Sequence, residues 1–233
     1  MTGLFKKATV LTGVGIVALG AAAPANAQTI YRDITFDLGE KSFADEVVSY
    51  NRGGDDGNYS LASFELFSNP EDALGAPDSI WGRGDNNEHL LEGYRDDVSL
   101  GQGGSIVLEF TDNYLTGSGD SSDDLWIFEA GGLTENMFVE ISADGQNWSD
   151  KFFVGGTQEA GIDIDAYGYG KNDLFSFVRI TDGGGNAYEG GWSGADIDAV
   201  GALSAKQVPE PATVLGLLAV GALGIGAKRQ RKA

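Results

Sequence analysis

Two stretches of the chain, GIDIDAYG and GADIDAVG, place pairs of aspartates at the same spacing. In a β-strand side chains alternate between two faces, so Asp163 and Asp165 would share one face, opposite the isoleucines. The simplest interpretation is structural: each stretch is a strand with an apolar inner face and an acidic outer face. The alternative is that some of these carboxylates bind a cation.

Calcium is the cation that such groups suit, because it takes six to eight oxygen ligands from carboxylates and carbonyls. Asp196 follows the glycine-rich GGWSGA and is the best-placed ligand, with Asp198 and Asp182 as partners. Two other acidic segments, 69–78 and 117–124, are either solvated turns or looser cation sites. The second, GSGDSSDD, lacks the ligand spacing of an EF-hand. Calcium is therefore the one cofactor expected.

Four aromatic residues lie in segments rich in Gly, Asp and Asn, where a ring can stack on the C–H face of a sugar. They are the candidate ligand-binding residues Trp81, Tyr94, Tyr188 and Trp192. Their expected ligand is a polysaccharide. The alternative is that Trp192 folds back as a lid over the edge of the domain.

Catalytic constellations are scarce. His89 is the single histidine, there is no cysteine for a zinc site, and no G-x-S-x-G elbow occurs. A pair of carboxylates could serve a glycosidase, but so many acidic residues meet that spacing by chance. We therefore expect no enzyme, and keep a secreted glycan-active enzyme as the third hypothesis.

The elements that must position these residues are strands. Apolar residues alternate with polar ones in GSIVLEFT, NMFVEIS and LFSFVRIT, and DLWIFEA, KFFVGG and TIYRDITFDL are further candidates. Clusters such as DGQN and DGGGN mark the turns between them. Many short strands with glycine-rich turns predict an all-β fold, an antiparallel β-sandwich over residues 28–207.

The N-terminus has the three parts of a secretory signal peptide over residues 1–27. Two lysines precede an apolar segment, expected to be helical, and Ala25 and Ala27 flank a signal peptidase site. The alternative is an uncleaved membrane helix. Export without cysteine leaves the domain without disulfides.

The C-terminal segment, residues 208–233, begins with Val208, Pro209, Glu210 and Pro211. A short apolar stretch, residues 212–227, follows and is expected to form a hydrophobic helix, and four basic residues close the chain. This stretch is shorter than the ~20 residues of a usual spanning helix. The basic cluster would stay on the cytoplasmic side, so we expect transient membrane insertion.

Between these segments the chain is strongly acidic. The whole sequence has a formal net charge of −20, and residues 28–207 keep nine of the 15 basic and 34 of the 35 acidic residues, a net charge of −25. Such a surface repels nucleic acid and anionic lipid and favours cations.

The Pro-Glu-Pro sequence, the short hydrophobic helix and the basic end together resemble the PEP-CTERM sorting signal of Gram-negative bacteria. The resemblance covers about the last 26 residues. It implies recognition of Pro209, Glu210 and Pro211 by an exosortase, with cleavage there. It also implies export to the cell surface or exopolysaccharide matrix after transient anchoring in the inner membrane. A plain membrane anchor is the alternative.

A second resemblance concerns the domain itself. VEISADGQNWSD and the later FSFVRITDGG are similar to strands of discoidin-like, galactose-binding-like jelly rolls. That resemblance spans about residues 70–203 and implies a sandwich of jelly-roll type. The cysteine pair that joins the ends of many discoidin domains is absent, and no binding residue can be carried over.

The leading functional hypothesis is a non-catalytic carbohydrate-binding or matrix-associated module at the cell surface. A purely structural or adhesive surface protein without a small ligand is the alternative.

Overall fold

The computed structural model describes residues 28–54, 67–79, 97–130, 134–155, 159–184 and 194–209. These residues form strands and three short 3-10 helices, and no α-helix occurs among them. The strands are β1 (Thr29–Tyr31), β2 (Ile34–Phe36), β3 (Glu46–Asn51), β4 (Val98–Ser99), β5 (Ser105–Glu109), β6 (Asn113–Leu115), β7 (Leu125–Glu129), β8 (Met137–Ser142), β9 (Phe152–Val154), β10 (Glu159–Ile162), β11 (Phe177–Asp182), β12 (Asp196–Ala202) and β13 (Ala205–Gln207). The 3-10 helices are η1 (Gly39–Ser42), η2 (Pro70–Ala73) and η3 (Asp165–Tyr167).

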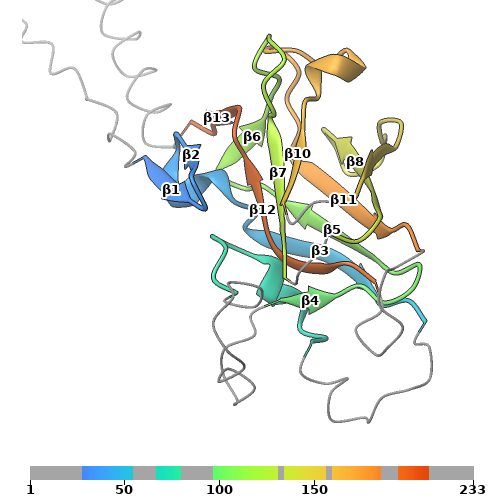
Figure 1. The fold of residues 1–233 in the computed structure, drawn as a ribbon. Helices are drawn as coiled ribbons and strands as arrows, with labels where there is room; N and C mark the ends of the chain where they lie inside the picture. Colours follow the sequence, from blue (N-terminus) through green and yellow to red (C-terminus); the bar gives the residue numbers. More distant parts are fainter. Residues whose placement is uncertain are drawn as a thin grey trace, which may run out of the picture.

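Two antiparallel sheets make the body. One has four strands in the order β10-β7-β12-β4, and the other has five in the order β3-β5-β11-β8-β9. Two small pairs, β1 with β2 and β13 with β6, complete the described strands. Figure 1 shows the strands of the two large sheets running across each other.

One hydrophobic cluster joins the two sheets. Ile106, Val178 and Ile141 from the five-stranded sheet lie in the same buried cluster as Ile127 and Val200 from the four-stranded sheet. The predicted alternation is therefore confirmed in β5, β8 and β11, whose inward residues are fully buried. A shared core between two antiparallel sheets is compatible with the predicted β-sandwich.

The outer side of the four-stranded sheet is covered. Phe36 and Phe43 from the N-terminal segment pack with Phe128 of β7 and Ala199 of β12 in a second buried cluster. Phe36 and Phe43 lie 4.6 Å apart between ring centroids. Among the described residues, no such cluster lies on the outer side of the five-stranded sheet.

The predicted strand TIYRDITFDL is instead a hairpin. Arg32 and Asp33 between β1 and β2 both have positive φ, 47° and 68°. Two consecutive left-handed residues are what a two-residue type I′ hairpin turn requires. The hairpin is what brings Phe36 over the four-stranded sheet.

The predicted signal-peptide and C-terminal helices, Ala25, Ala27, Glu210 and Pro211 lie outside the described residues. None of the helices in the described ranges is long and apolar enough to cross a membrane.

Candidate functional site

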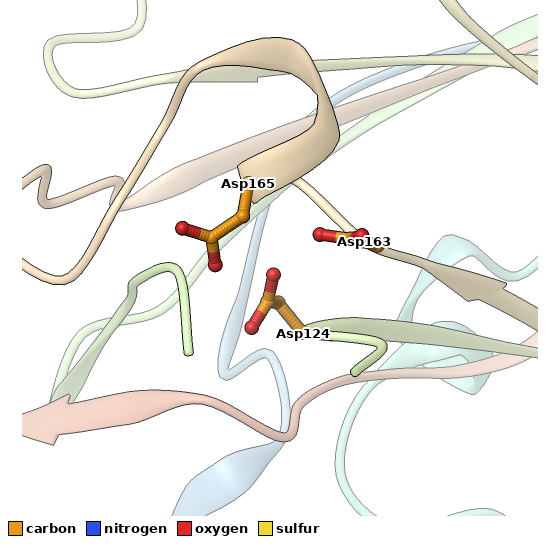
Figure 2. Close-up of side chains that lie close together, drawn as sticks. All are labelled: Asp124, Asp163 and Asp165. Carbon is orange, nitrogen blue, oxygen red and sulfur yellow. The ribbon is translucent and has the colours of Figure 1, made fainter. Parts of the chain in front are cut away.

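Three aspartates meet at the end of the four-stranded sheet (Figure 2). Asp124 directly precedes β7, Asp163 directly follows β10, and Asp165 begins η3. Ile162 of β10 is paired with Leu125 of β7, so the antiparallel pairing brings these chain ends together. One carboxylate oxygen from each aspartate lies within 4.8 Å of the others. We call these three residues the aspartate trio.

Backbone amides hold the trio in place. Asp124 is fully buried and accepts hydrogen bonds from the N–H groups of Ser118, at 2.6 Å, and Ile164, at 3.0 Å. Asp165 accepts from the N–H of Gly119 at 2.8 Å. Fixed carboxylates at this spacing are the hard oxygen donors that calcium prefers, so the residues present fit that ion.

The prediction that GIDIDAYG is a strand with an acidic outer face is wrong beyond Ile162. The strand ends there and the chain turns into η3, while Ile164 stays fully buried. Asp163 and Asp165 are therefore half-buried at a sheet end, not aligned on a strand face. The sequence pointed separately to these aspartates and to the segment 117–124, but not to their meeting, because the β10–β7 pairing is a long-range contact.

A second group of carboxyls includes two of the predicted calcium ligands. Asp182 accepts hydrogen bonds from the N–H groups of Gly103 and Gly184. Glu129 accepts from the N–H groups of Glu135, at 2.9 Å, and Asp196, at 3.3 Å. Sequence reasoning missed Glu129, which lies in β7, and Glu135, which directly precedes the segment leading into β8.

Burial dominates the electrostatics of this second group. It raises the pKa of Glu129 to about 8, against the hydrogen bonds that Glu129 accepts. Burial, followed by the charges of Asp196, Glu129 and Asp182, raises the pKa of Glu135 to about 9. Glu129 and Glu135 therefore favour the protonated form at neutral pH.

Asp198 lies apart from both groups. It is fully buried, and its Oδ1 accepts hydrogen bonds from the N–H groups of Asp78 and Ser79 at 3.1 and 3.0 Å. Its other oxygen lies 3.6 Å from a guanidinium nitrogen of Arg32. Burial raises the pKa of Asp198 to about 6. The predicted acidic outer face of GADIDAVG is wrong for Asp198, because residues from 28–45 and 67–79 cover that side of the sheet.

The four predicted ligand-binding aromatics, Trp81, Tyr94, Tyr188 and Trp192, lie outside the described residues, as does His89. Other aromatic residues lie on the outer side of the five-stranded sheet, where the described residues form no buried cluster. Because inward residues of β8, β9 and β11 belong to the core, their neighbours in sequence face outward. We call the outward-facing Phe138, Phe153, Phe177 and Arg179, with Glu140, Trp148 and Lys151, the outer strip.

Charged and aromatic groups in the outer strip contact one another through hydrogen bonds and cation–π interactions. Arg179 and Glu140 are directly opposite in the β11–β8 pair and make two hydrogen bonds, at 2.6 and 2.9 Å. The Arg179 guanidinium carbon lies 4.2 Å from the centroid of the Trp148 ring. The Arg179 side chain remains 30% exposed, whereas that of Glu140 is 9% exposed.

The other half of the strip is centred on Phe138 and Phe153, which face each other across the β8–β9 pair with ring centroids 5.8 Å apart. Phe153 is 60% exposed, which is unusual for so large an apolar side chain. The Lys151 ammonium lies 5.2 Å from the centroid of the Phe138 ring. The outer strip therefore combines an exposed aromatic ring with charged groups that contact aromatic faces.

Residues 207–232 match the PEP-CTERM protein-sorting motif, which confirms the prediction from the sequence. This motif implies export to the cell surface and processing by an exosortase. It matches none of the curated proteins with which it was compared.

Proposed function

We propose that this protein is a non-catalytic module that binds polysaccharide at the cell surface or in the exopolysaccharide matrix. The observation that carries the proposal is the outer strip: an exposed Phe153, a Trp148–Arg179–Glu140 arrangement and Lys151 on the outer side of the five-stranded sheet. The sorting motif supports it, because the tail takes the protein to where polysaccharide is found. Transient inner-membrane anchoring in a Gram-negative bacterium belongs to the same proposal.

The domain is proposed to be a jelly roll. Without β3, the strand orders are β4-β12-β7-β10 and β5-β11-β8-β9. When β6, which pairs with β13, is also left out, the eight strands from β4 to β12 numbered along the chain read 1-8-3-6 and 2-7-4-5. This is the pairing that two Greek keys produce in an eight-stranded jelly roll. This order supports the assignment independently of any sequence resemblance.

Calcium is proposed as a structural ligand of the aspartate trio. Three carboxylate oxygens within 4.8 Å of one another repel unless a cation or protons lie between them. Carbonyls of the 117–124 segment and water would supply the remaining ligands that calcium needs. The second group, with Asp196 and Asp182, is the alternative position.

An enzyme is the weaker proposal, and the raised pKa of Glu129 is the observation that favours it. A carboxyl with a pKa of about 8 could act as a general acid. Glu129 is only 4% exposed, however, and backbone N–H groups approach both of its oxygens. A group so enclosed has no room for a substrate, which supports a structural role.

The test is binding of the exported protein to polysaccharide purified from its own bacterium, by isothermal titration calorimetry. Phe153→Ala is expected to weaken binding at least tenfold, because it removes the most exposed ring of the outer strip. Tyr167→Ala is the matched control: Tyr167 is 52% exposed but stacks on the inward-facing Phe152 at the sandwich edge. It is expected to bind like the wild type.

Two results would contradict the proposal. Loss of binding on Trp192→Ala, with Phe153→Ala unchanged, would move the site to the 185–193 segment. Absence of binding to any polysaccharide, with calcium-dependent self-association, would favour the purely structural or adhesive alternative.

A further inference from the structure

The folded body continues to the first residue of the sorting motif. Strand β13 is antiparallel to β6, with Lys206 opposite Tyr114 and Gln207 opposite Asn113 (Figure 1). The Val208 N–H then donates to the Asp112 carbonyl at 2.8 Å. Pro209, the first residue of Pro-Glu-Pro, follows immediately. No linker separates the domain from the motif.

This pairing occupies the main-chain groups next to the motif. Proteins that recognise an extended segment commonly pair with its backbone N–H and C=O groups, as an added strand pairs with a sheet. From Ala205 to Val208, strand β6 and Asp112 already hold that side of the chain. An enzyme that must bind the backbone of the residues preceding Pro209 therefore competes with β6 for it.

The β13–β6 pair has features that favour local opening. Strand β13 has three residues, none of them fully buried, and pairs only with β6 among the described strands. Asn113 is fully buried, yet neither its side-chain oxygen nor its side-chain nitrogen has a hydrogen-bond partner in the part of the chain that the structure describes. An uncompensated amide weakens the element that contains it. Short terminal strands with few buried groups are the parts of a fold that open first.

Opening β13 would remove only Ala205 from the margin of the core cluster. Leu115 of β6 is fully buried and exchanges two backbone hydrogen bonds with Phe175, at 2.9 and 3.0 Å. Strand β6 therefore stays attached when β13 leaves. The sandwich and the chain end are separable units.

We propose that β13 and Val208 form a releasable clip, and that the exosortase takes the sorting motif only after residues 205–208 leave β6. The clip makes processing depend on a local opening of the folded domain. This inference rests on the motif match and the β13–β6 contacts, and is independent of polysaccharide binding.

A cross-strand disulfide tests the clip. Directly opposite residues in an antiparallel pair have Cα atoms about 4.5–5.5 Å apart, within the range a disulfide accepts. Tyr114→Cys with Lys206→Cys introduces the only two cysteines of the chain. The full-length double variant is expressed in the exosortase-bearing host, and the ratio of tail-bearing to processed chain is followed by pulse–chase. Each single-cysteine variant serves as the control.

The clip predicts that the oxidised double variant is processed at least tenfold more slowly than either single variant. A six-residue Gly-Ser insertion between Val208 and Pro209 in the same cross-linked chain is expected to restore processing, because it supplies free backbone beside the motif. Processing of the cross-linked chain at the rate of the single variants would overturn the inference. So would a block that the insertion does not relieve, since access would then not be the cause.

Hydrogen exchange gives a second readout that needs no exosortase. The Val208 amide of the full chain is expected to exchange at least a hundredfold faster than the amides of β11. Equal protection of β13 and β11 would show that the clip opens only with the whole domain, which would also overturn the proposal.

Discussion

Glu135→Gln tests whether the second group of carboxyls costs stability. Glu135 carries a buried carboxyl oxygen, Oε2, that has no hydrogen-bond partner, and its pKa is raised from 4.5 to about 9 by burial and by the charges of Asp196, Glu129 and Asp182. Glutamine keeps the shape and removes the charge. Among the described residues, none donates a hydrogen bond to the Glu135 side chain, so the substitution tests the charge itself.

The direction of the pKa shift decides whether Glu135 stabilises or destabilises the folded state. A carboxyl with a raised pKa in the folded state costs nothing below pH 4.5, where both states hold the proton. The cost grows as the pH rises, because the unfolded chain ionises first, and it levels off above about pH 9. At pH 7 an unscreened group would cost roughly 3 kcal/mol. Glu135 is only partly buried, so solvent screening reduces the expected cost to about 1–2 kcal/mol.

The assay is urea unfolding of residues 28–209 in EDTA at pH 5, 7 and 9. Glu135→Gln is expected to be more stable than the wild type by about 1–2 kcal/mol at pH 7, by more at pH 9, and by almost nothing at pH 5. Glu71→Gln, at an exposed position in η2, should change little at any pH. A Glu135→Gln protein that is no more stable than the wild type at pH 9 would show that the Glu135 carboxyl does not lower the stability of the fold.

Three further predictions concern packing and calcium. Gly201→Ala should destabilise by about 1–3 kcal/mol in urea unfolding, because its Cβ would lie 2.6 Å from Phe36 and 2.9 Å from Phe43; an unchanged midpoint would contradict the cover on the four-stranded sheet. Ile180→Ala should cost about 2–5 kcal/mol, because Ile180 is fully buried between the sheets, and a cost below 1 kcal/mol would contradict that packing. Calcium at a hundredfold its Kd should stabilise the wild type by about 2.7 kcal/mol in thermal unfolding, and Asp163→Asn should remove most of the gain; an equal response of both proteins would exclude the aspartate trio.

Local patterns in the sequence predicted four strands of the five-stranded sheet, β5, β8, β9 and β11, but not β3. Residues such as Ile106 and Leu108, or Val178 and Ile180, alternate with polar residues, and each pair is fully buried on one side. Period-two alternation depends only on neighbours along the chain, so it can be read without the structure.

Features that depend on distant contacts could not be read in the same way. Asp198 looked like a solvent-facing residue because nothing nearby in sequence reveals that Asp78, Ser79 and Arg32 surround it. The hairpin turn at Arg32 was hidden because arginine rarely takes a positive φ.

In the candidate site, too, local patterns could be predicted from the sequence and long-range contacts could not. The sequence indicated acidic ligands and loop aromatics, and the structure gathers Asp163, Asp165 and Asp124 into one trio. The outer strip was missed because Arg179, Glu140 and Trp148 are ordinary strand and turn residues when read singly. Only the β11–β8 register makes them neighbours.

Mapping the surface that polysaccharide protects is the most direct measurement of the central claim. Amide and side-chain NMR shifts of the exported domain, titrated with the polysaccharide of its own bacterium, would locate the contact. If polysaccharide binds the outer strip, the largest shift changes are expected at Phe138, Phe153, Trp148 and Arg179. The shifts around Phe36, on the covered face, are expected to stay unchanged. Changes confined to Trp81, Tyr94, Tyr188 and Trp192, or no change anywhere, would contradict it.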